Sequence, residues 1–163
     1  MSCALGLILL TITLAPRLAL AGPDVLSPEG YGLVPFGITV ERAEIVLKQR
    51  TTKPYEAAGC SYVEFKKYPR VQFMIEEGVV TRADATGDLE NSANIRIGMT
   101  LDKVRAMHPS VKIEPHKYDE NGHYLILEAN DGRAAIVLEE GGGKVTDIRA
   151  GLKPSVEYVE RCL

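Results

Sequence analysis

The segment from Glu114 to Tyr124 holds the densest set of side chains that could do chemistry. It reads Glu-Pro-His-Lys-Tyr-Asp-Glu-Asn-Gly-His-Tyr, and its Asn121-Gly122 step is typical of a hairpin turn. His116 and His123 are then expected on facing strands, close to opposite each other. Two imidazoles beside several carboxylates could bind Zn²⁺, which accepts nitrogen and oxygen ligands in tetrahedral geometry. A small metal-binding protein or a metal-dependent hydrolase is therefore one hypothesis.

Other interpretations of His116 and His123 stay open. Their spacing matches no established zinc motif, and histidines on adjoining strands often pair or hydrogen-bond as structural groups. Either could act as a general acid or base, but the sequence offers no nucleophile and no third group to orient the ring. The Gly-x-Ser-x-Gly, His-Glu-x-x-His and EF-hand patterns do not occur. We therefore expect a protein that is not an enzyme and has no cofactor.

Tyrosine is the second residue type that indicates binding, because its large ring and polar tip suit recognition surfaces. Tyrosines at strand and hairpin positions could share one sheet face with the two histidines. The alternative is that Tyr62, Phe65 and Tyr124 fill the core while the hydroxyl groups reach its rim. The predicted binding residues are Tyr62, Tyr68, Tyr118, Tyr124, His116 and His123.

Composition limits the class of protein. The chain has 163 residues, of which 45% are hydrophobic and 25% charged, as in ordinary globular proteins. This excludes a disordered chain, a collagen, a coiled coil and a multi-span membrane protein. The formal charge of -3 argues against a broadly basic nucleic-acid surface. The short basic run Lys66-Lys67-Tyr68-Pro69-Arg70 is interpreted as a solvated turn.

The amino-terminal segment predicts export. The apolar run Ala4–Ala15 is too short to span a bilayer as a helix. Small residues then occupy the -3 and -1 positions of a cut after Ala21, which matches a secretory signal peptide over residues 1–21. A retained anchor helix is the alternative. One feature departs from the signal-peptide pattern, because no Lys or Arg precedes the run. We expect a periplasmic or secreted protein with no integral membrane segment after signal removal.

Two cysteines, Cys60 and Cys162, remain after the predicted cut. An even number in an oxidising compartment indicates one disulfide, which would tie down the last residues of the chain. A reactive thiol is the alternative, but neither cysteine has a neighbouring base in the sequence.

The sequence contains an internal duplication. Three segments recur in the same order with small insertions in the second copy, and together they indicate a tandem repeat. They are Phe36–Ala43 with Ile97–Val104, Met74–Gly78 with Val137–Gly141, and Val80-Thr81 with Val145-Thr146, at offsets of 61, 63 and 65.

Each copy is expected to be a helix followed by antiparallel strands. Thr39 and Thr100 are N-cap candidates, each with an acid two positions later, at Glu41 and Asp102. Short turn sequences separate the strands and demand antiparallel neighbours. The predicted strands are Ser61–Lys66, Val71–Glu76, Val79–Ala85, Val111–Lys117, His123–Ala129, Arg133–Glu139 and Lys144–Leu152. The predicted core-facing helix residues are Val40, Ala43, Val46, Leu47, Leu101, Val104 and Met107.

The expected architecture is α+β, with two tandem helix-plus-antiparallel-meander repeats and the helices packed on one face of the sheet or sheets. The two sheets would lie side by side or face each other. Residues 22–85 form the first repeat, 86–94 a polar linker and 95–163 the second repeat, within one compact domain. Residues 22–32 are expected to be an irregular lead-in.

The Gly-[Ile/Met]-Thr-x-[Glu/Asp]-x-[Ala/Val] pattern at the start of each helix resembles the tandem repeats of the beta-lactamase inhibitory proteins. It is also similar to small outer-membrane assembly lipoproteins with one such unit. A closer resemblance is to uncharacterised exported proteobacterial proteins ending in Val-Glu-Tyr-Val-Glu-x-Cys. The motifs that carry it are Ile95–Gly98, Glu114–Tyr118, Gly122–Leu125 and Val156–Cys162.

These resemblances imply an exported protein and assign no catalytic residues. Inhibitory-protein relatives often carry a disulfide in each repeat, so the two cysteines here argue against transferring the inhibitor function. The sequence predicts a non-enzymatic binding module of the bacterial cell envelope, whose partner is a protein or an envelope component. Nucleic acid is not expected as a partner, and the sequence does not set the oligomeric state. The alternatives are metal chemistry at His116 and His123, or an assembly role at the outer membrane.

Overall fold

The computed structural model describes residues 24–53 and 58–162, so the predicted signal peptide lies outside the described residues. The described chain contains ten strands, two α-helices and one short 3-10 helix. They are β1 (Leu26–Ser27), β2 (Gly30–Tyr31), β3 (Val34–Pro35), α1 (Val40–Leu47), β4 (Cys60–Val63), β5 (Val71–Glu76), β6 (Val79–Ala85), α2 (Leu101–Met107), β7 (Lys112–Pro115), β8 (His123–Glu128), β9 (Ala134–Gly141), β10 (Lys144–Leu152) and η1 (Ser155–Glu157).

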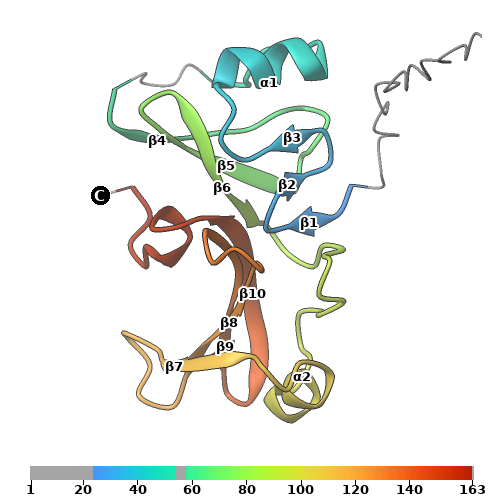
Figure 1. The fold of residues 1–163 in the computed structure, drawn as a ribbon, viewed down its shortest axis with the longest axis vertical. Helices are drawn as coiled ribbons and strands as arrows, with labels where there is room; N and C mark the ends of the chain where they lie inside the picture. Colours follow the sequence, from blue (N-terminus) through green and yellow to red (C-terminus); the bar gives the residue numbers. More distant parts are fainter. Residues whose placement is uncertain (1–23, 54–57, 163) are drawn as a thin grey trace, which may run out of the picture.

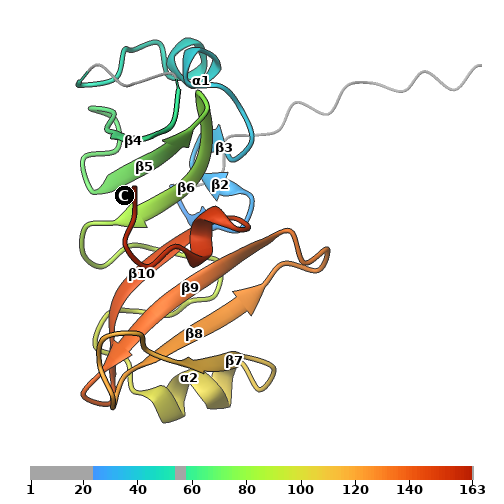
Figure 2. The same ribbon diagram turned by 90° about the vertical axis from the view of Figure 1, so that its left-hand side faces the viewer.

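Seven strands form one antiparallel sheet in the order β4-β5-β6-β10-β9-β8-β7, and β1, β2 and β3 form a small separate sheet. The two groups of hairpins meet where β6 pairs with β10, with Asp84 opposite Arg149. Figure 2 shows the resulting continuous sheet, and Figure 1 shows α1 and α2 at opposite ends of the long axis. The α+β prediction is confirmed, and the strands lie side by side.

One face of the sheet is apolar and is covered by both helices and the small sheet. On β5, the alternate residues Val71, Phe73 and Ile75 point into a single buried cluster. Val40 of α1 and Val104 of α2 belong to the same cluster, so both helices pack on this side. We call it the helix-covered face.

The helices begin where their capping residues predict. The Thr39 hydroxyl accepts a hydrogen bond from the Arg42 N–H at 3.2 Å, and Thr100 accepts from Lys103 at 3.4 Å. These contacts satisfy backbone donors that would otherwise have no partner in the first turn.

The prediction that Val46 and Met107 face the core is wrong. Their side chains are 37% and 39% exposed. Each lies six residues after the first core residue of its helix. At about 100° per residue, six residues rotate the side chain roughly 120° away from the buried stripe. In α1 the residues in register with Val40 are Ala43, which is buried, and Leu47, which packs partly buried on the same cluster.

Three predicted strands have the observed bounds, namely β5, β6 and β10. The predicted irregular lead-in is corrected over its described part, because β1 and β2 form there. Leu26 explains why: its N–H donates to the Glu90 carbonyl, and its own carbonyl accepts from the Ser92 N–H, both at 2.9 Å. The polar segment after β6 thus pairs with the lead-in and buries Leu89 and Asn91.

The two helix entries make matching backbone hydrogen bonds. Gly37 N–H donates to the Val80 carbonyl before α1, and Gly98 N–H donates to the Val145 carbonyl before α2, both at 2.8 Å. Each helix therefore enters over the start of a long hairpin strand.

The turns of the two hairpins show which residues of one hairpin are equivalent to which residues of the other. Glu77-Gly78 connects β5 to β6, and Gly142-Gly143 connects β9 to β10, so equivalent turn residues are 65 apart. The sequence match of Met74–Gly78 with Val137–Gly141, at offset 63, differs from this register by two residues. The match of Val80-Thr81 with Val145-Thr146, at offset 65, agrees with the positions of the two turns.

Candidate functional site

The face of the sheet opposite the helices carries buried charged groups. Arg82, 2% exposed, donates from Nε to both carboxylate oxygens of Asp84, at 3.1 and 2.9 Å. Arg149 is also buried, and its Nη1 contacts Glu139 Oε1 at 2.5 Å. Charges almost never lie this deep unless they are paired. We call this side the strap-covered face.

Residues 153–162, which include η1, cross this face, and we call them the strap. Arg82 Nη1 donates to the carbonyl oxygens of Ser155 at 3.2 Å and Tyr158 at 2.7 Å. Arg149 Nε donates to the Val156 carbonyl at 2.9 Å. The buried arginines therefore hold the strap by its backbone, and Figure 2 shows it in dark red against the sheet.

The end of the strap is held covalently. Cys162 forms a disulfide with Cys60 at the start of β4, with a Cα–Cα distance of 5.3 Å, which confirms the predicted pairing. Beneath the strap, Val156 and Val159 pack on a second apolar cluster that includes Tyr124 and Ile126.

His116 belongs to the strap-covered face. Its ring stacks on Tyr124 with a centroid distance of 4.6 Å, and its Nε2 lies 3.5 Å from Glu139 Oε2. Its Nδ1 accepts from the N–H groups of Tyr118 and Asp119, at 3.2 and 3.1 Å. Because Nδ1 is an acceptor, the neutral ring carries its proton on Nε2 and turns it toward Glu139.

His123 lies on the other face. Its Nδ1 is 2.6 Å from Glu140 Oε2, and Glu140 is buried and also accepts from the Gly143 N–H at 2.6 Å. Glu139 and Glu140 are consecutive in β9, so their side chains point to opposite sides of the sheet. The two predicted ligands therefore pair with carboxylates on different faces.

The hairpin register explains this separation. His123 pairs with Pro115, which places His116 one residue beyond the position opposite His123. A shift of one residue turns a side chain to the other face of a strand. Among residues 24–53 and 58–162, no group of three or more His, Cys, Asp or Glu side chains could hold a metal ion.

The four predicted tyrosines lie in four different environments. Tyr68 is buried in the helix-covered core and its hydroxyl accepts from the Leu33 N–H at 2.9 Å. Tyr124 is buried under the strap. Tyr62 is half-buried and donates to Asp84 Oδ2 at 3.2 Å; burial, reinforced by the Asp84 charge, raises the pKa of its hydroxyl. Tyr118 is 66% exposed.

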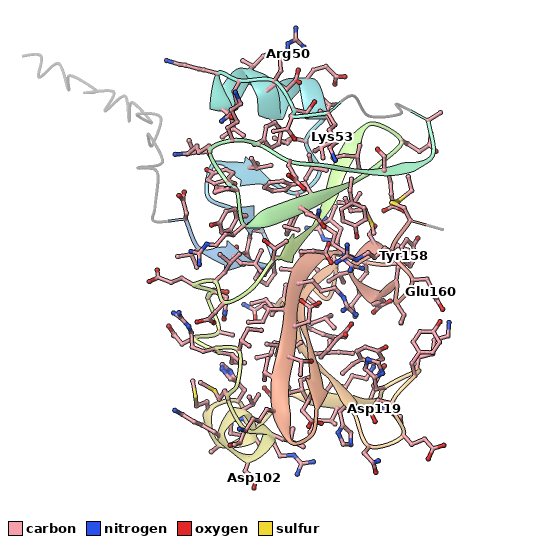
Figure 3. All side chains as sticks on the ribbon, turned by 180° about the vertical axis from the view of Figure 1, so that it is seen from behind. Arg50, Lys53, Asp102, Asp119, Tyr158 and Glu160 are labelled. Carbon is pink, nitrogen blue, oxygen red and sulfur yellow. A yellow bond between two sulfur atoms is a disulfide. The ribbon has the colours of Figure 1, made fainter. Side chains whose placement is uncertain are left out.

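Tyr118 lies next to the strap. Its hydroxyl and the Lys117 ammonium both bond to Glu160 Oε1, and Lys117 Nζ lies 5.3 Å from the centroid of the Tyr118 ring. Tyr158, also on the strap, is partly exposed, and Figure 3 places it beside Glu160. We name the exposed residues Lys117, Tyr118, Tyr158 and Glu160 the Tyr118 surface.

Tyr158 also borders the disulfide. It lines an open hollow of about 410 Å³ together with Cys60, Glu76, Glu160, Arg161 and Cys162. Arg161 extends the contact toward β4, because its guanidinium lies 5.4 Å from the centroid of the Tyr62 ring. The strap thus carries both the covalent tie and exposed polar and aromatic groups.

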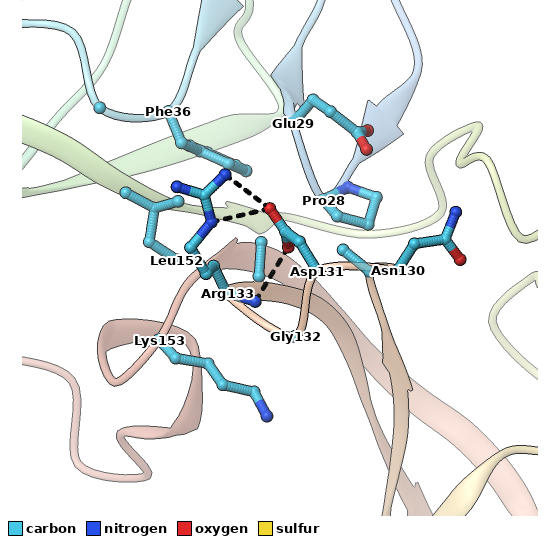
Figure 4. Close-up of a pocket in the computed structure, with 12 residues that line it drawn as sticks. Pro28, Glu29, Phe36, Asn130, Asp131, Gly132, Arg133, Leu152 and Lys153 are labelled. Atoms are coloured by element: carbon cyan, nitrogen blue, oxygen red, sulfur yellow. Dashed lines mark hydrogen bonds and ion pairs between the residues drawn. The ribbon is translucent and has the colours of Figure 1, made fainter.

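A larger open pocket of about 910 Å³ lies between the small sheet and the β8–β9 turn (Figure 4). Pro28, Phe36 and Leu152 supply its apolar walls. Arg133 and Asp131 stand at its edge, paired with each other at 2.8 Å from Nε to Oδ2. Nothing in the sequence indicated this pocket, because its walls come from three separate parts of the chain.

The buried charges of the strap-covered face were also missed from the sequence. A signal for them exists: Arg82 and Asp84 interrupt the apolar strand Val79–Ala85, and Asp147 and Arg149 interrupt Lys144–Leu152. Charged residues in the middle of a strand whose neighbours are apolar indicate a sheet face that is polar and covered.

Comparisons of the chain with models of known families, with curated proteins and with solved structures find no match. None of the helices in the described part of the chain is long and apolar enough to cross a membrane. The functional argument therefore rests on the contacts of this chain alone.

Proposed function

We propose that the chain is an exported, non-enzymatic binding module of the bacterial cell envelope. It engages a protein or an envelope component through the Tyr118 surface. The observation that carries the proposal is the placement of Tyr118, which is largely exposed yet bonded to Glu160 on the strap.

A fixed, exposed tyrosine suits recognition. Tyrosine is enriched among the residues that dominate binding energy, because it offers a large contact area with a polar tip. Ordering a free side chain at an interface costs about 0.5–1.5 kcal/mol, so a ring already held by Glu160 and Lys117 loses less on binding. Of the six predicted binding residues, Tyr118 is the one that makes the proposed contact. The Nδ1 atom of His116 accepts a hydrogen bond from the Tyr118 N–H.

The disulfide supports export. Disulfides persist in oxidising compartments and are rare in the cytosol, so the Cys60–Cys162 bridge fits a periplasmic or secreted protein. The predicted signal peptide over residues 1–21 is the corresponding sequence feature.

Tandem repetition is a further part of the proposal. Each long hairpin has one extra residue at the same place, Thr81 in β6 and Thr146 in β10, and those residues are 65 apart like the turns. Together with the matching capping threonines, this supports an origin by duplication of one helix-plus-hairpin unit. Equal losses of stability from Thr39→Ala and Thr100→Ala, about 1 kcal/mol each, would fit equivalent caps.

The binding proposal is tested by site-specific photo-crosslinking in the cells that export the protein. The photoreactive residue p-benzoylphenylalanine replaces Tyr118 in one variant and Asp102, on exposed α2 at one end of the molecule, in a matched control. We expect discrete adducts from position 118 that disappear when Tyr158→Ala and Glu160→Ala are added. Equal adduct patterns at both positions, or none at 118, would overturn the assignment.

A further inference from the structure

The end of the molecule formed by α1 exposes apolar side chains. α1 lies at one end of the long axis (Figure 1), and Ile45, at 64% exposed, points away from the core together with Val46. Single exposed apolar residues are common on proteins. These two are notable because of the charges that surround them.

Basic residues border this apolar spot. Ile45, Lys48 and Arg50 line the same open hollow of about 470 Å³ beside α1. Two acids, Glu41 and Glu44, also line it. Glu44 is buried and accepts from Arg50 Nη1 at 2.6 Å and from the Thr51 N–H at 3.0 Å, so its charge is compensated within the protein.

The β4–β5 loop brings more lysines to the same end. The Lys67 N–H donates to Gln49 Oε1 at 3.3 Å, and the Thr52 N–H donates to the Glu64 carbonyl at 2.9 Å. These contacts hold the loop against the residues that follow α1. Lys66 and Lys67 are therefore close to the hollow, and both are exposed.

The lysines at this end have no carboxylate partner in the part of the chain that the structure describes. Within the described residues, Lys48, Lys53, Lys66 and Lys67 make no salt bridge, and the Lys67 ammonium lies 5.3 Å from the centroid of the Tyr68 ring. On the strap side of the molecule the pattern is the opposite, since Lys117 and the buried arginines are paired with carboxylates. In a chain whose formal charge is -3, this is a local concentration of available positive charge.

We propose that the α1 end binds an anionic phospholipid surface. Ile45 and Val46 enter the boundary between headgroups and acyl chains, and the surrounding lysines approach lipid phosphates. An apolar face flanked by lysines is the arrangement by which surface helices bind anionic membranes. Dispersed ammonium groups match the diffuse charge of a bilayer surface without requiring a shaped acidic partner. The proposal uses a different surface from Tyr118 and goes beyond the proposed function.

The test is flotation of the purified, disulfide-bonded protein with vesicles. One set contains 30% phosphatidylglycerol in phosphatidylcholine and the other contains phosphatidylcholine alone. We expect binding to the anionic vesicles only, with release as salt rises, because screening weakens attraction between exposed charges. Soluble glycerol phosphate should not compete, since it offers no surface for Ile45. Binding to neither set, as an acidic protein partner would give, overturns the proposal.

Two variants locate the surface. Each lysine near an anionic membrane strengthens binding by roughly fivefold, so Lys66→Glu with Lys67→Glu should weaken it by at least about 25-fold. The matched control, Lys103→Glu with Arg105→Glu, changes the net charge equally but at α2, and should weaken binding far less. Equal losses would show attraction by net charge alone and overturn the assignment. Ile45→Ser should weaken binding in the same assay without changing its salt dependence.

Discussion

The two faces of the large sheet are covered in different ways. The helix-covered face is closed by many apolar residues from α1, α2 and the small sheet, which form one cluster. The strap-covered face is closed by residues 153–162, held by Arg82, Arg149 and the disulfide. The first face relies on many apolar contacts, while the second combines a smaller apolar cluster with a few buried polar contacts and one covalent bond.

This difference determines how much stability a substitution on each face removes. Removing part of an apolar side chain leaves a cavity whose cost depends on how well its neighbours relax. Removing one member of a buried ion pair leaves the other charge without a partner in a site with little water, which costs more. The strap-covered face should therefore be the more sensitive of the two to single substitutions.

The largest effect is expected from Arg82→Met. It leaves Asp84 buried without its main partner and removes the donor to the Ser155 and Tyr158 carbonyls, so the free energy of unfolding should fall by about 3–5 kcal/mol. Urea unfolding measures it. Ile75→Val on the opposite face should cost only about 0.5–1.5 kcal/mol. Adding Asp84→Leu to Arg82→Met should restore part of the loss, and a double variant no more stable than the single one would contradict this account.

The second-largest effect on stability is expected from removing the disulfide. Cys60→Ala with Cys162→Ala opens a loop with a sequence separation of 102 and should lower the free energy of unfolding by about 2–4 kcal/mol. Hydrogen exchange separates the two faces: amides of the strap should lose protection first, whereas those of β5 should follow global unfolding. Equal loss of protection at both would show that the strap does not open separately.

A smaller effect concerns Asp147 on β10. Burial, reinforced by the charges of Glu139 and Asp84, raises the pKa of this carboxyl above its ordinary value, although the Ile148 N–H opposes the shift. The folded protein then holds a proton that the unfolded chain has already released. Stability contributed by Asp147 is therefore lost as pH rises from the ordinary pKa through the raised one.

Asp147→Asn should consequently stabilise the protein at pH 7 and flatten this part of the pH profile. A difference of one pKa unit corresponds to about 1.4 kcal/mol. Denaturant unfolding between pH 3 and pH 7 tests it, and the gain should vanish near the low end of that range. A gain of the same size at every pH would point to a cause other than titration.

The smallest effect is expected at Ser61. The Ser61 hydroxyl oxygen is buried without a hydrogen-bond partner in the described structure. Ser61→Ala should therefore leave stability unchanged or raise it by up to about 1 kcal/mol. The matched variant is Ser155→Ala, which removes a bond to Glu76 and should lower stability by about 1 kcal/mol. Thermal unfolding compares the two, and changes of the same sign would contradict the prediction.

Local signals made much of the fold predictable. Thr39 and Thr100 mark the helix starts because a hydroxyl before an apolar stripe caps the first turn. The strands Val71–Glu76 and Val79–Ala85 are set by the two-residue turn between them. The cysteine pairing follows from there being two cysteines after the predicted cut.

The candidate site was less predictable because it depends on register and on distant segments. His116 and His123 lie on different faces because of a single residue of offset in the hairpin. Exposure of Tyr118 and burial of Tyr124 depend on where the strap crosses, and that path is set by Arg82 and Arg149. The lysines around α1 come together only because the β4–β5 loop folds back onto Gln49.

The disulfide closes residues 60–162 into a covalent ring, and the residues before Cys60 form an arm outside that ring. Every residue between Cys60 and Cys162 belongs to a covalent ring, so one protease cut there leaves a single molecule that separates only on reduction. α1 lies on the arm outside the ring, so after a cut between Lys48 and Lys53 it would be held by core packing, through Val40 and Ala43, and by no covalent bond. Such a cut would divide the lysine-flanked end, because Ile45 and Lys48 lie on the arm whereas Lys66, Lys67 and the Tyr118 surface stay within the covalent ring.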